Sequence, residues 1–380
     1  MGSPAALAVT RLDLTDFRSY AHLRLTLEPG PVVLVGPNGA GKTNLLEALS
    51  FLAPGRGLRR ARLADITRRE AGPDARWAVA ARLRCAAETL EIGTGLDPEG
   101  GETRKVRIDG QPARGQVELS RRAGAVWLTP AMDRLMSEGP AGRRRFLDRI
   151  VFGFDADHAG RVAAYERALR ERAHLVEEKG RAADPAWLDA LEATLAAKGV
   201  AIAATRKEAV ERLARVIEAA EDGFPKARLQ AAGALEEGLE RWPAIEVEAR
   251  FRADLAGARG EGPTPGPHRS DLVVHHGPTG APAGQCSTGE QKALLVTLVL
   301  AQARLMAEAR GFMPLVLLDE VAAHLDAKRR ADLFAALGGL RAQFWATGTD
   351  RTLFAGMENR VQFLGVDRGA VTTSEGADQG

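Results

Sequence analysis

The octapeptide GPNGAGKT at residues 36–43 has the composition and spacing of a loop that binds phosphate groups. Its glycines allow backbone N–H groups to surround phosphate oxygens, and Lys42 is placed to reach the β and γ phosphates of a nucleotide. The hydroxyl of Thr43 is a suitable ligand for Mg²⁺. The alternative is a glycine turn that only caps a helix, but the apolar strand before the loop and the helix after it favour phosphate binding.

The segment PLVLLDE at residues 314–320 is an apolar strand that ends in two acids. Asp319 is placed to hold Mg²⁺ through water, and Glu320 to orient or deprotonate an attacking water molecule. Apolar strands that end in acids are common, so this motif alone is ambiguous. Its presence in one chain with a phosphate loop favours a site of nucleotide hydrolysis.

A third motif, QCSTGEQK at residues 285–292, lies between these two in the sequence. Ser287 and Glu290 form an S-x-x-E capping box for the apolar helix that follows. Gly289 lies in the first turn of that helix, next to exposed N–H groups that could bind a phosphate brought by another subunit. Capping and phosphate recognition are compatible, so the motif supports both roles.

Strands and helices must hold these motifs in place. Residues 7–35 alternate apolar and polar side chains and end in the buried strand PVVLV, directly before the phosphate loop. Alternating segments around 77–83, 88–92 and 104–108, with a hairpin turn at Asp109-Gly110, predict an antiparallel subdomain. Further strands are predicted near 271–275, at 314–318 and at 343–347, and a helix at 287–310.

From about residue 131 apolar residues recur at helical spacing, which predicts an insertion of long helices. Asp184-Pro185 supplies an N-cap and a first-turn proline, so one helix is expected from 185 to about 221, paired with its predecessor in an arm. A connector rich in glycine and proline follows. We therefore divide the chain into residues 1–130, which carry the phosphate loop and the antiparallel subdomain, the helical insertion 131–262, and residues 263–380, in which the first fold resumes.

The composition excludes several classes of protein. Lys and Arg total 52 and Asp and Glu total 50, so the chain is neither a histone-like basic protein nor an acidic solvating one. Cys85 and Cys286 form no CxxC pair, which argues against a disulfide framework or a zinc site. No apolar run is long enough to cross a membrane, and we expect a cytoplasmic protein without a membrane partner.

The order of the motifs resembles that of the ATP-binding-cassette head, in which two heads clamp two ATP molecules between the phosphate loop of one and the signature motif of the other. Longer strings over nearly the whole chain resemble the RecF family: LTDFRSY (14–20), GKTNLLEAL (41–49), EGPAGRRRFLDR (138–149), GPHRSDL (266–272) and STGEQKALL (287–295). The resemblance implies an α/β fold, namely a P-loop ABC-type ATPase head with an antiparallel β subdomain and an inserted helical arm.

The resemblance also implies roles for single residues, with ATP and Mg²⁺ as cofactors. The nucleotide-binding residues would be Gly36, Asn38, Gly39, Ala40, Gly41, Lys42 and Thr43. Thr43 and Asp319 would hold Mg²⁺, and Glu320 would be the catalytic residue that acts on the hydrolytic water. Ser287, Gly289 and Glu290 would contact the nucleotide of the opposing subunit. Asp326, at the end of AHLD, would line the dimer seam.

Similarity to this family implies an ATP-dependent homodimer that binds gapped DNA at junctions between single strand and duplex. It further implies cooperation with RecO and RecR in loading RecA during recombinational repair and replication restart. The sequence TGTD at residues 347–350 stands where many cassette proteins have a switch histidine, and no glutamine is evident near Thr129-Pro130. We therefore expect a weak, DNA-stimulated ATPase that works as a switch.

Two other functions are compatible with the motifs. A transport ATPase subunit would need a surface for a membrane partner and normally lacks a helical arm of this size. A structural adaptor would use the nucleotide only to dimerise, without significant hydrolysis. The strings RRRFLD and GPHRSDL argue against the transport subunit.

The densest basic segment of the chain follows the phosphate-loop helix. Arg56, Arg59, Arg60 and Arg62 are candidate contacts to DNA phosphates, and Arg68 and Arg69 lie close behind, with Asp65 as the one acid in this stretch. The alternative is a solvated surface in an arginine-rich protein. No series of aromatic residues suits the stacking of bases, so we expect recognition of the DNA backbone and of junction shape.

Overall fold

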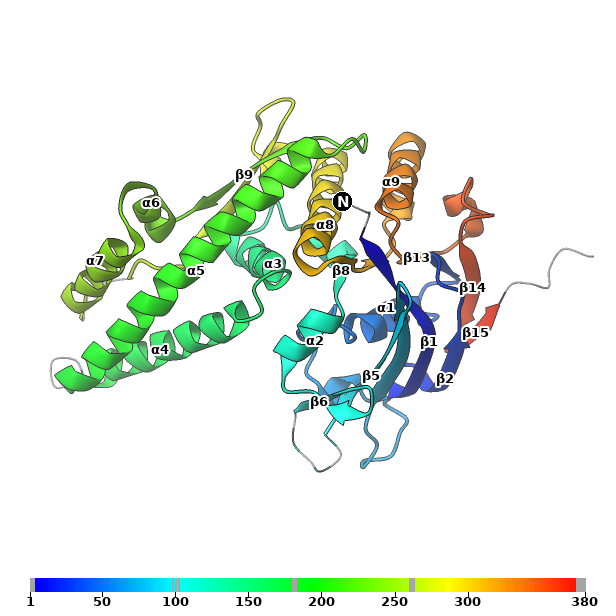
Figure 1. Ribbon diagram of the computed structural model, residues 1–380, viewed down its shortest axis with the longest axis horizontal. Helices are drawn as coiled ribbons and strands as arrows, with labels where there is room; N and C mark the ends of the chain where they lie inside the picture. The colour runs from blue at the N-terminus through cyan, green and yellow to red at the C-terminus, as the bar shows by residue number, and fades with distance from the viewer. Residues whose placement is uncertain are drawn as a thin grey trace, which may run out of the picture. The chain divides into compact units, whose positions relative to one another are not determined.

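The computed structural model describes residues 4–97, 99, 101, 103–179, 183–259 and 264–373 (Figure 1). These residues form two compact units. The head unit comprises Met1–Asp133, Ala220–Phe224 and Leu295–Gly380, and the arm unit comprises Arg134–Ala219 and Pro225–Leu294. None of the helices in the described ranges combines the length and the hydrophobicity needed to cross a lipid bilayer.

A largely parallel sheet lies in the head unit. Its strands are β3 (Val32–Val35), β8 (Ala125–Leu128), β12 (Leu315–Leu318), β13 (Phe344–Gly348), β14 (Gln362–Asp367) and β15 (Ala370–Thr373), in the spatial order β15-β14-β3-β13-β12-β8. All neighbours pair in parallel except β14 and β15. The inner strands are apolar and buried on both faces, as parallel strands require. This order places β13 between β3 and β12, so the carboxyl ends of these three strands meet at one edge.

A second, mainly antiparallel sheet belongs to the same unit. It contains β1 (Ala5–Phe17), β2 (Tyr20–Thr26), β4 (Ala78–Cys85), β5 (Glu88–Leu96), β6 (Arg104–Ile108), β7 (Gln111–Pro112) and β11 (Phe312–Met313), the last parallel to β1. The predicted antiparallel subdomain and its hairpin turn are confirmed, since Asp109 and Gly110 have φ of 50° and 79° between β6 and β7. Residues of both sheets share one buried core with Leu45, Leu46 and Leu49 of α1 (Lys42–Ser50).

The head unit also contains α2 (Gln116–Arg122), α9 (Ala327–Leu340) and the second part of α8 (Thr288–Arg310). Asp326 caps the N-terminus of α9, because its carboxylate accepts a hydrogen bond from the backbone N–H of Arg329 at 2.8 Å. The mixed α/β fold that the sequence predicted is thus present.

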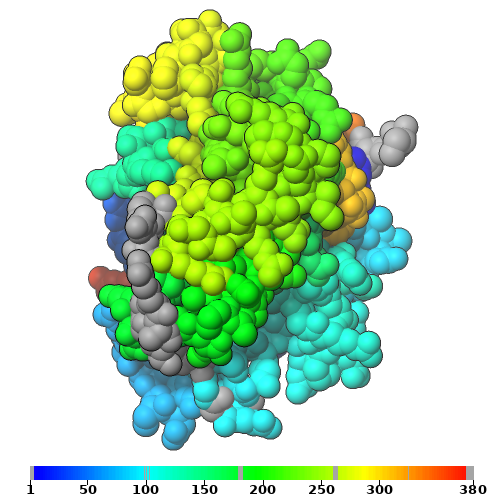
Figure 2. All heavy atoms as spheres, turned by 90° about the vertical axis from the view of Figure 1, so that its left-hand side faces the viewer, coloured from blue at the N-terminus to red at the C-terminus, as the bar shows by residue number. Residues whose placement is uncertain are grey.

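The arm unit is mainly helical. Its helices are α3 (Pro140–Phe152), α4 (His158–Lys179), α5 (Pro185–Ala219), α6 (Ala234–Arg241) and α7 (Ala244–Gly257), and α8 begins in it. Asp184 caps α5 as predicted, since its carboxylate accepts a hydrogen bond from the N–H of Ala186 at 2.9 Å. Side chains of α4, α5, α6 and α7 share a second core around Tyr165 and Phe251. In Figure 2, α5 to α7, coloured green to yellow-green, form much of the arm-unit surface in view.

The arm unit also contains a two-stranded antiparallel sheet, β9 (Ala227–Ala232) and β10 (Asp271–His276). The sequence prediction assigned β10 to the part of the chain where the first fold resumes, but its partner is β9, and the arm unit continues to Leu294. The reason is that β9, with the sequence ARLQAA, is short and half alanine, which is depleted in strands, so it gave no strand signal. The domain division at 130 and 262 thus differs from the compact units and stays a prediction.

Candidate functional site

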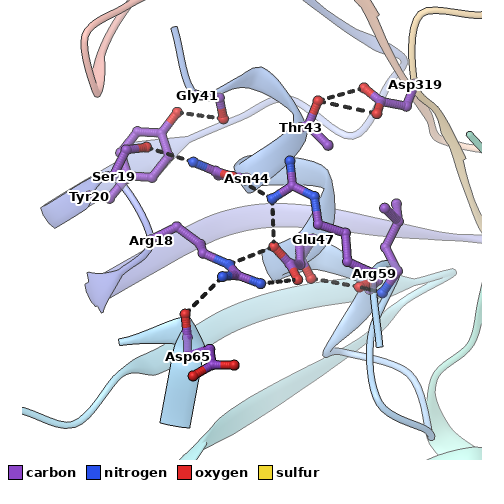
Figure 3. A network of polar contacts seen from close by, with 12 residues as sticks. Arg18, Ser19, Tyr20, Gly41, Thr43, Asn44, Glu47, Arg59, Asp65 and Asp319 are labelled. Atoms are coloured by element: carbon purple, nitrogen blue, oxygen red, sulfur yellow. Dashed lines mark hydrogen bonds and ion pairs between the residues drawn. The ribbon is translucent and has the colours of Figure 1, made fainter. Parts of the chain in front are cut away.

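The phosphate loop connects the carboxyl end of β3 to the first residue of α1. Gly36 lies so close to β14 that a Cβ there would stand 2.0 Å from the carbonyl oxygen of Val366, which leaves no room for any side chain. Gly41 has φ of 114°, and a Cβ on it would lie 2.7 Å from the Tyr20 hydroxyl. That hydroxyl donates to the Gly41 carbonyl at 3.1 Å (Figure 3). The two glycines therefore fix the path of the loop.

The ammonium group of Lys42 folds back onto this loop. Its Nζ donates to the carbonyl oxygens of Gly36 at 2.6 Å and Pro37 at 2.8 Å. Burial lowers the pKa of Lys42, although the nearby carboxylates of Glu320 and Asp319 oppose that shift. A buried cation that bonds to neutral carbonyls is stabilised further by an anion, so the loop fits a phosphate group.

A chain of hydroxyl and carboxylate groups joins the ends of three strands. Thr43 Oγ1 donates to Asp319 at 2.9 Å from Oδ1 and 3.1 Å from Oδ2, and Thr347 Oγ1 donates to Oδ1 at 2.9 Å. Burial raises the pKa of Asp319 in spite of these hydrogen bonds, and the adjacent Glu320 raises it too. The positive charge of Arg59 lowers the pKa of this carboxyl group, but burial outweighs it. A hydroxyl beside such a carboxylate is a donor set that Mg²⁺ accepts, with water and phosphate oxygens as further ligands.

Glu320 follows Asp319 in a strained turn. Its φ of 52° lies in the left-handed region, which is uncommon for a residue with a side chain. The backbone N–H of Glu320 donates to Thr347 Oγ1 at 2.8 Å, so the hydroxyl that donates to Asp319 also holds this turn. The sequence alone did not indicate this role of Thr347. The available sequence signal is a polar residue near the end of a buried strand. That strand, β13, lies between β3 and β12, which precede the phosphate loop and the acidic pair.

A buried carboxylate connects α1 to the basic segment that follows it (Figure 3). Glu47 is fully buried, and Arg18 binds it through Nε at 2.9 Å and Nη2 at 2.8 Å. Arg59 Nη1 donates to Glu47 Oε2 at 3.0 Å and to Asn44 Oδ1 at 2.7 Å. The guanidinium of Arg59, a predicted DNA contact, thus already has protein partners next to the phosphate loop.

The remaining candidate arginines of this segment, Arg56, Arg60 and Arg62, are exposed. Arg104 of β6 anchors the backbone before them. Its guanidinium is buried and donates to the carbonyl oxygens of Phe51, Ala53 and Gly55, the last at 2.8 Å. Burial lowers the pKa of Arg104 to about 10. Arg104 therefore fixes the backbone up to Gly55, while DNA contact by the arginines that follow stays a prediction.

The third motif lies in the arm unit and forms the predicted capping box. Glu290 Oε2 accepts hydrogen bonds from the Ser287 N–H at 2.8 Å and its hydroxyl at 2.6 Å, and the Glu290 N–H donates to Ser287 Oγ at 3.3 Å. Gly289 lies in the first turn of α8. The role of these residues toward a second subunit, like that of Asp326 at a dimer seam, stays a prediction.

The parallel sheet, the phosphate loop after β3 and the acidic pair after β12 define the chain as an ABC/SMC-type P-loop ATPase head with an arm. The sequence profile described as "RecF/RecN/SMC N terminal domain" matches residues 8–372. The chain is 50% identical over 382 residues to the "DNA replication and repair protein RecF" of Mesorhizobium japonicum, covering 98% of this chain and 100% of that protein. The chain belongs to the RecF family.

Solved structures agree on the fold. The structure described as "recombination mediator protein RecF-ATPrS in RecFOR pathway" superimposes with a TM-score of 0.84 at 20% sequence identity, covering 98% of this chain and 100% of that one. The "SmcHead bound to the C-winged helix domain of ScpA" gives a TM-score of 0.54 at 17% identity, covering 97% of this chain and 98% of that one. At these identities the likeness concerns the fold alone.

Proposed function

We propose that this chain is an ATP-dependent DNA-binding protein of recombinational repair and replication restart. ATP binding closes a homodimer on gapped DNA or on a junction between single strand and duplex, and hydrolysis opens it again. The proposal is supported by the hydrogen bonds from Thr43 and Thr347 to Asp319, which join the phosphate loop to the acidic pair. They bring a hydroxyl and a buried carboxylate together beside the phosphate loop, an arrangement that suits Mg²⁺ and a triphosphate.

The residues of the site have distinct roles. Backbone N–H groups of Asn38 to Gly41 and the Lys42 ammonium bind the phosphates, and Thr43 with Asp319 holds Mg²⁺. The bound nucleotide supplies a phosphoanhydride bond that water can cleave. Glu320 is the base that orients and deprotonates this water. Thr347 positions Glu320, because its hydroxyl accepts a hydrogen bond from the Glu320 backbone N–H. Hydrolysis is slow, because the sequence TGTD at residues 347–350 stands where many cassette proteins have a switch histidine.

Dimer closure needs a second surface for the nucleotide. We propose that Ser287 and Gly289 of one subunit contact the γ-phosphate bound by the other, with Asp326 at the seam. In the single chain the Ser287 hydroxyl donates to Glu290 at 2.6 Å, so it must rotate to serve a phosphate. The helix N–H groups around Gly289 supply the positive end of the α8 dipole for that contact.

The partners follow from the family. The curated relative is called a DNA replication and repair protein, and the solved relative is described as part of the RecFOR pathway. We propose DNA, RecO and RecR as partners of this chain in the cytoplasm, with loading of RecA as the result. Arg56, Arg59, Arg60 and Arg62 are proposed DNA contacts, although Arg59 would have to leave Glu47 or use its remaining donors.

The test measures binding to gapped DNA, together with sedimentation, in the presence and absence of ATP and with Lys42→Met. Wild-type protein should dimerise and bind DNA tightly only with ATP and Mg²⁺, and Lys42→Met should do neither. Lys105→Met removes the same charge from an exposed side chain and serves as the control. Equal DNA binding in all three conditions, or a monomer at saturating ATP and DNA, would refute the ATP-closed dimer.

A Glu320→Gln variant separates the switch from a non-hydrolysing adaptor. If hydrolysis opens the dimer, this variant should stay dimeric on DNA for much longer than the wild-type protein after ATP is removed. An adaptor would show the same lifetime in both proteins.

A further inference from the structure

Two sequence strings that the nucleotide site does not use, RRRFLD and GPHRSD, come together in the arm unit. Arg143 of α3 binds Asp271 of β10 through Nε and Nη2, both at 2.8 Å. Arg144 Nη1 donates to the carbonyl oxygen of Ser270 at 2.8 Å. The first half of α3 therefore packs directly against the turn that precedes β10.

A buried ion pair from α5 supports the same turn. Arg206 binds both carboxylate oxygens of Asp148, at 2.8 and 2.9 Å, and its Nη1 donates to the Pro267 carbonyl at 2.5 Å. The Tyr165 hydroxyl lies 2.7 Å from Nδ1 of His268. The backbone and the imidazole of the turn are thus held by three helices, α3, α4 and α5.

Positive charge exceeds negative charge at this place. Arg143 and Arg206 have Asp271 and Asp148 as partners, whereas Arg144 bonds only to a carbonyl. Other side chains add to the excess: those of Arg145 and Arg269 are exposed, and within the described residues neither guanidinium has a hydrogen-bond or ion-pair partner. Three arginines in the first half of a helix also oppose the helix dipole.

The lowered pKa values of two groups agree with this excess of positive charge. The pKa of His268 is lowered, first by burial and then by the charges of Arg269, Arg144 and Arg206. Burial and Arg206 likewise lower the pKa of Arg144. The lowered pKa of His268 favours the neutral imidazole, in which Nδ1 can accept a hydrogen bond from the Tyr165 hydroxyl.

We propose that Arg144, Arg145, His268 and Arg269, hereafter the arm patch, bind backbone phosphates of a polynucleotide. The proposal rests on the proposed function, which brings DNA to the protein, and assigns the arm unit a contact of its own. Guanidinium groups match phosphate oxygens in geometry and charge. The anion would relieve the repulsion among these arginines, which Asp271 and Asp148 offset only in part.

The surroundings favour a nucleic acid over an acidic protein surface. Protein interfaces usually contain a buried aromatic or aliphatic anchor. The large exposed hydrophobic side chains of the described residues are Trp187 and Ile245, and they lie on α5 and α7, outside both strings. A patch of three arginines and an imidazole, without an exposed apolar anchor, suits a regular polyanion.

The test compares the double variant Arg145→Ala/Arg269→Ala with the wild-type protein in binding gapped DNA at several salt concentrations. Each lost phosphate contact lowers the slope of log K against log salt by about 0.9. Two contacts should therefore lower the slope by about 2, and the affinity at 0.15 M salt by roughly 30-fold. The control, Arg167→Ala/Arg252→Ala, removes two exposed arginines of the arm unit at other positions, and it should leave the slope nearly unchanged.

Arg145→Lys/Arg269→Lys keeps the charge and should retain most of the slope. ATP binding and ATP-dependent dimerisation without DNA should be the same in all these variants, since they lie outside the nucleotide site. If the Ala double variant binds DNA as well as the control does, the inference about the arm patch is overturned while the proposed function stands. An acidic protein would then be the candidate occupant of the patch. A wild-type protein that binds no DNA would overturn the proposed function together with the inference.

Discussion

Replacing Glu47 by Gln should destabilise the head unit strongly. The side chain is fully buried, and Arg18 and Arg59, whose side chains are 19% and 42% exposed, bind it as two cations. Gln fills the same volume but is neutral, and its NH₂ group would face a guanidinium donor. Removing one partner of a buried ion pair costs about 3 to 5 kcal/mol. We expect about 3 kcal/mol, because both arginines can partly hydrate once released.

Arg59→Gln is the matched control, because it breaks the exposed half of the network and leaves the pair of Glu47 with Arg18 intact. Arg59 is 42% exposed and Arg18 still neutralises Glu47, so the loss should be about 0.5 kcal/mol, as for an exposed pair. Urea unfolding followed by tryptophan fluorescence measures both variants. With a slope of about 2 kcal/mol per M, the midpoint should fall by about 1.5 M for Glu47→Gln and by about 0.25 M for the control. Equal shifts in the two variants would refute the assignment of Glu47 as the centre of the network.

Three more substitutions test the site. Gly36→Ala should destabilise the protein by about 3 kcal/mol in thermal unfolding, because its Cβ would stand 2.0 Å from the Val366 carbonyl oxygen. Asp319→Asn should abolish the stabilisation by ATP with Mg²⁺. Without nucleotide the variant should be more stable than the wild type near neutral pH but not below pH 3.8. Because the pKa of Asp319 is raised, the native state binds the proton more tightly than the unfolded state does. The free energy of unfolding of the wild type therefore falls as pH rises from 3.8 through the raised pKa. Thr347→Val should lower the rate of ATP hydrolysis about tenfold with little change in ATP affinity, because it releases the turn at Glu320.

Each of these predictions has a contradicting result. Gly338→Ala, at a helical position with open space around the new Cβ, should be tolerated, and equal damage there would remove the steric argument. A constant stability difference between Asp319→Asn and wild type from pH 3 to pH 8 would show that burial does not raise the Asp319 pKa. A normal hydrolysis rate in Thr347→Val would show that its hydroxyl does not position Glu320.

The parts of the fold that could be predicted are those encoded by neighbouring residues. The strand, loop and helix around Lys42, the capping box at Ser287 and the hairpin turn at Asp109 each depend on a few consecutive side chains. Their hydrogen bonds and dihedral angles are local, so the sequence pattern predicts them.

The parts that could not be predicted depend on which distant segments meet. Thr347 joins the site only because the sheet order places β13 between β3 and β12. The strand β9 is recognisable only through its pairing with β10. Arg143 and Asp271 are 128 positions apart, and no local pattern indicates that α3 packs on that turn.

Arg104 holds the segment after α1 through carbonyl oxygens, which every amino acid possesses. These carbonyl oxygens belong to Phe51, Ala53 and Gly55, so Arg104 fixes the course of the backbone up to the residue before Arg56. The exposed side chain of Arg56 takes no part in that anchor. A substitution of Arg56 therefore changes the charge of this surface without removing the hydrogen bonds that hold the backbone before it.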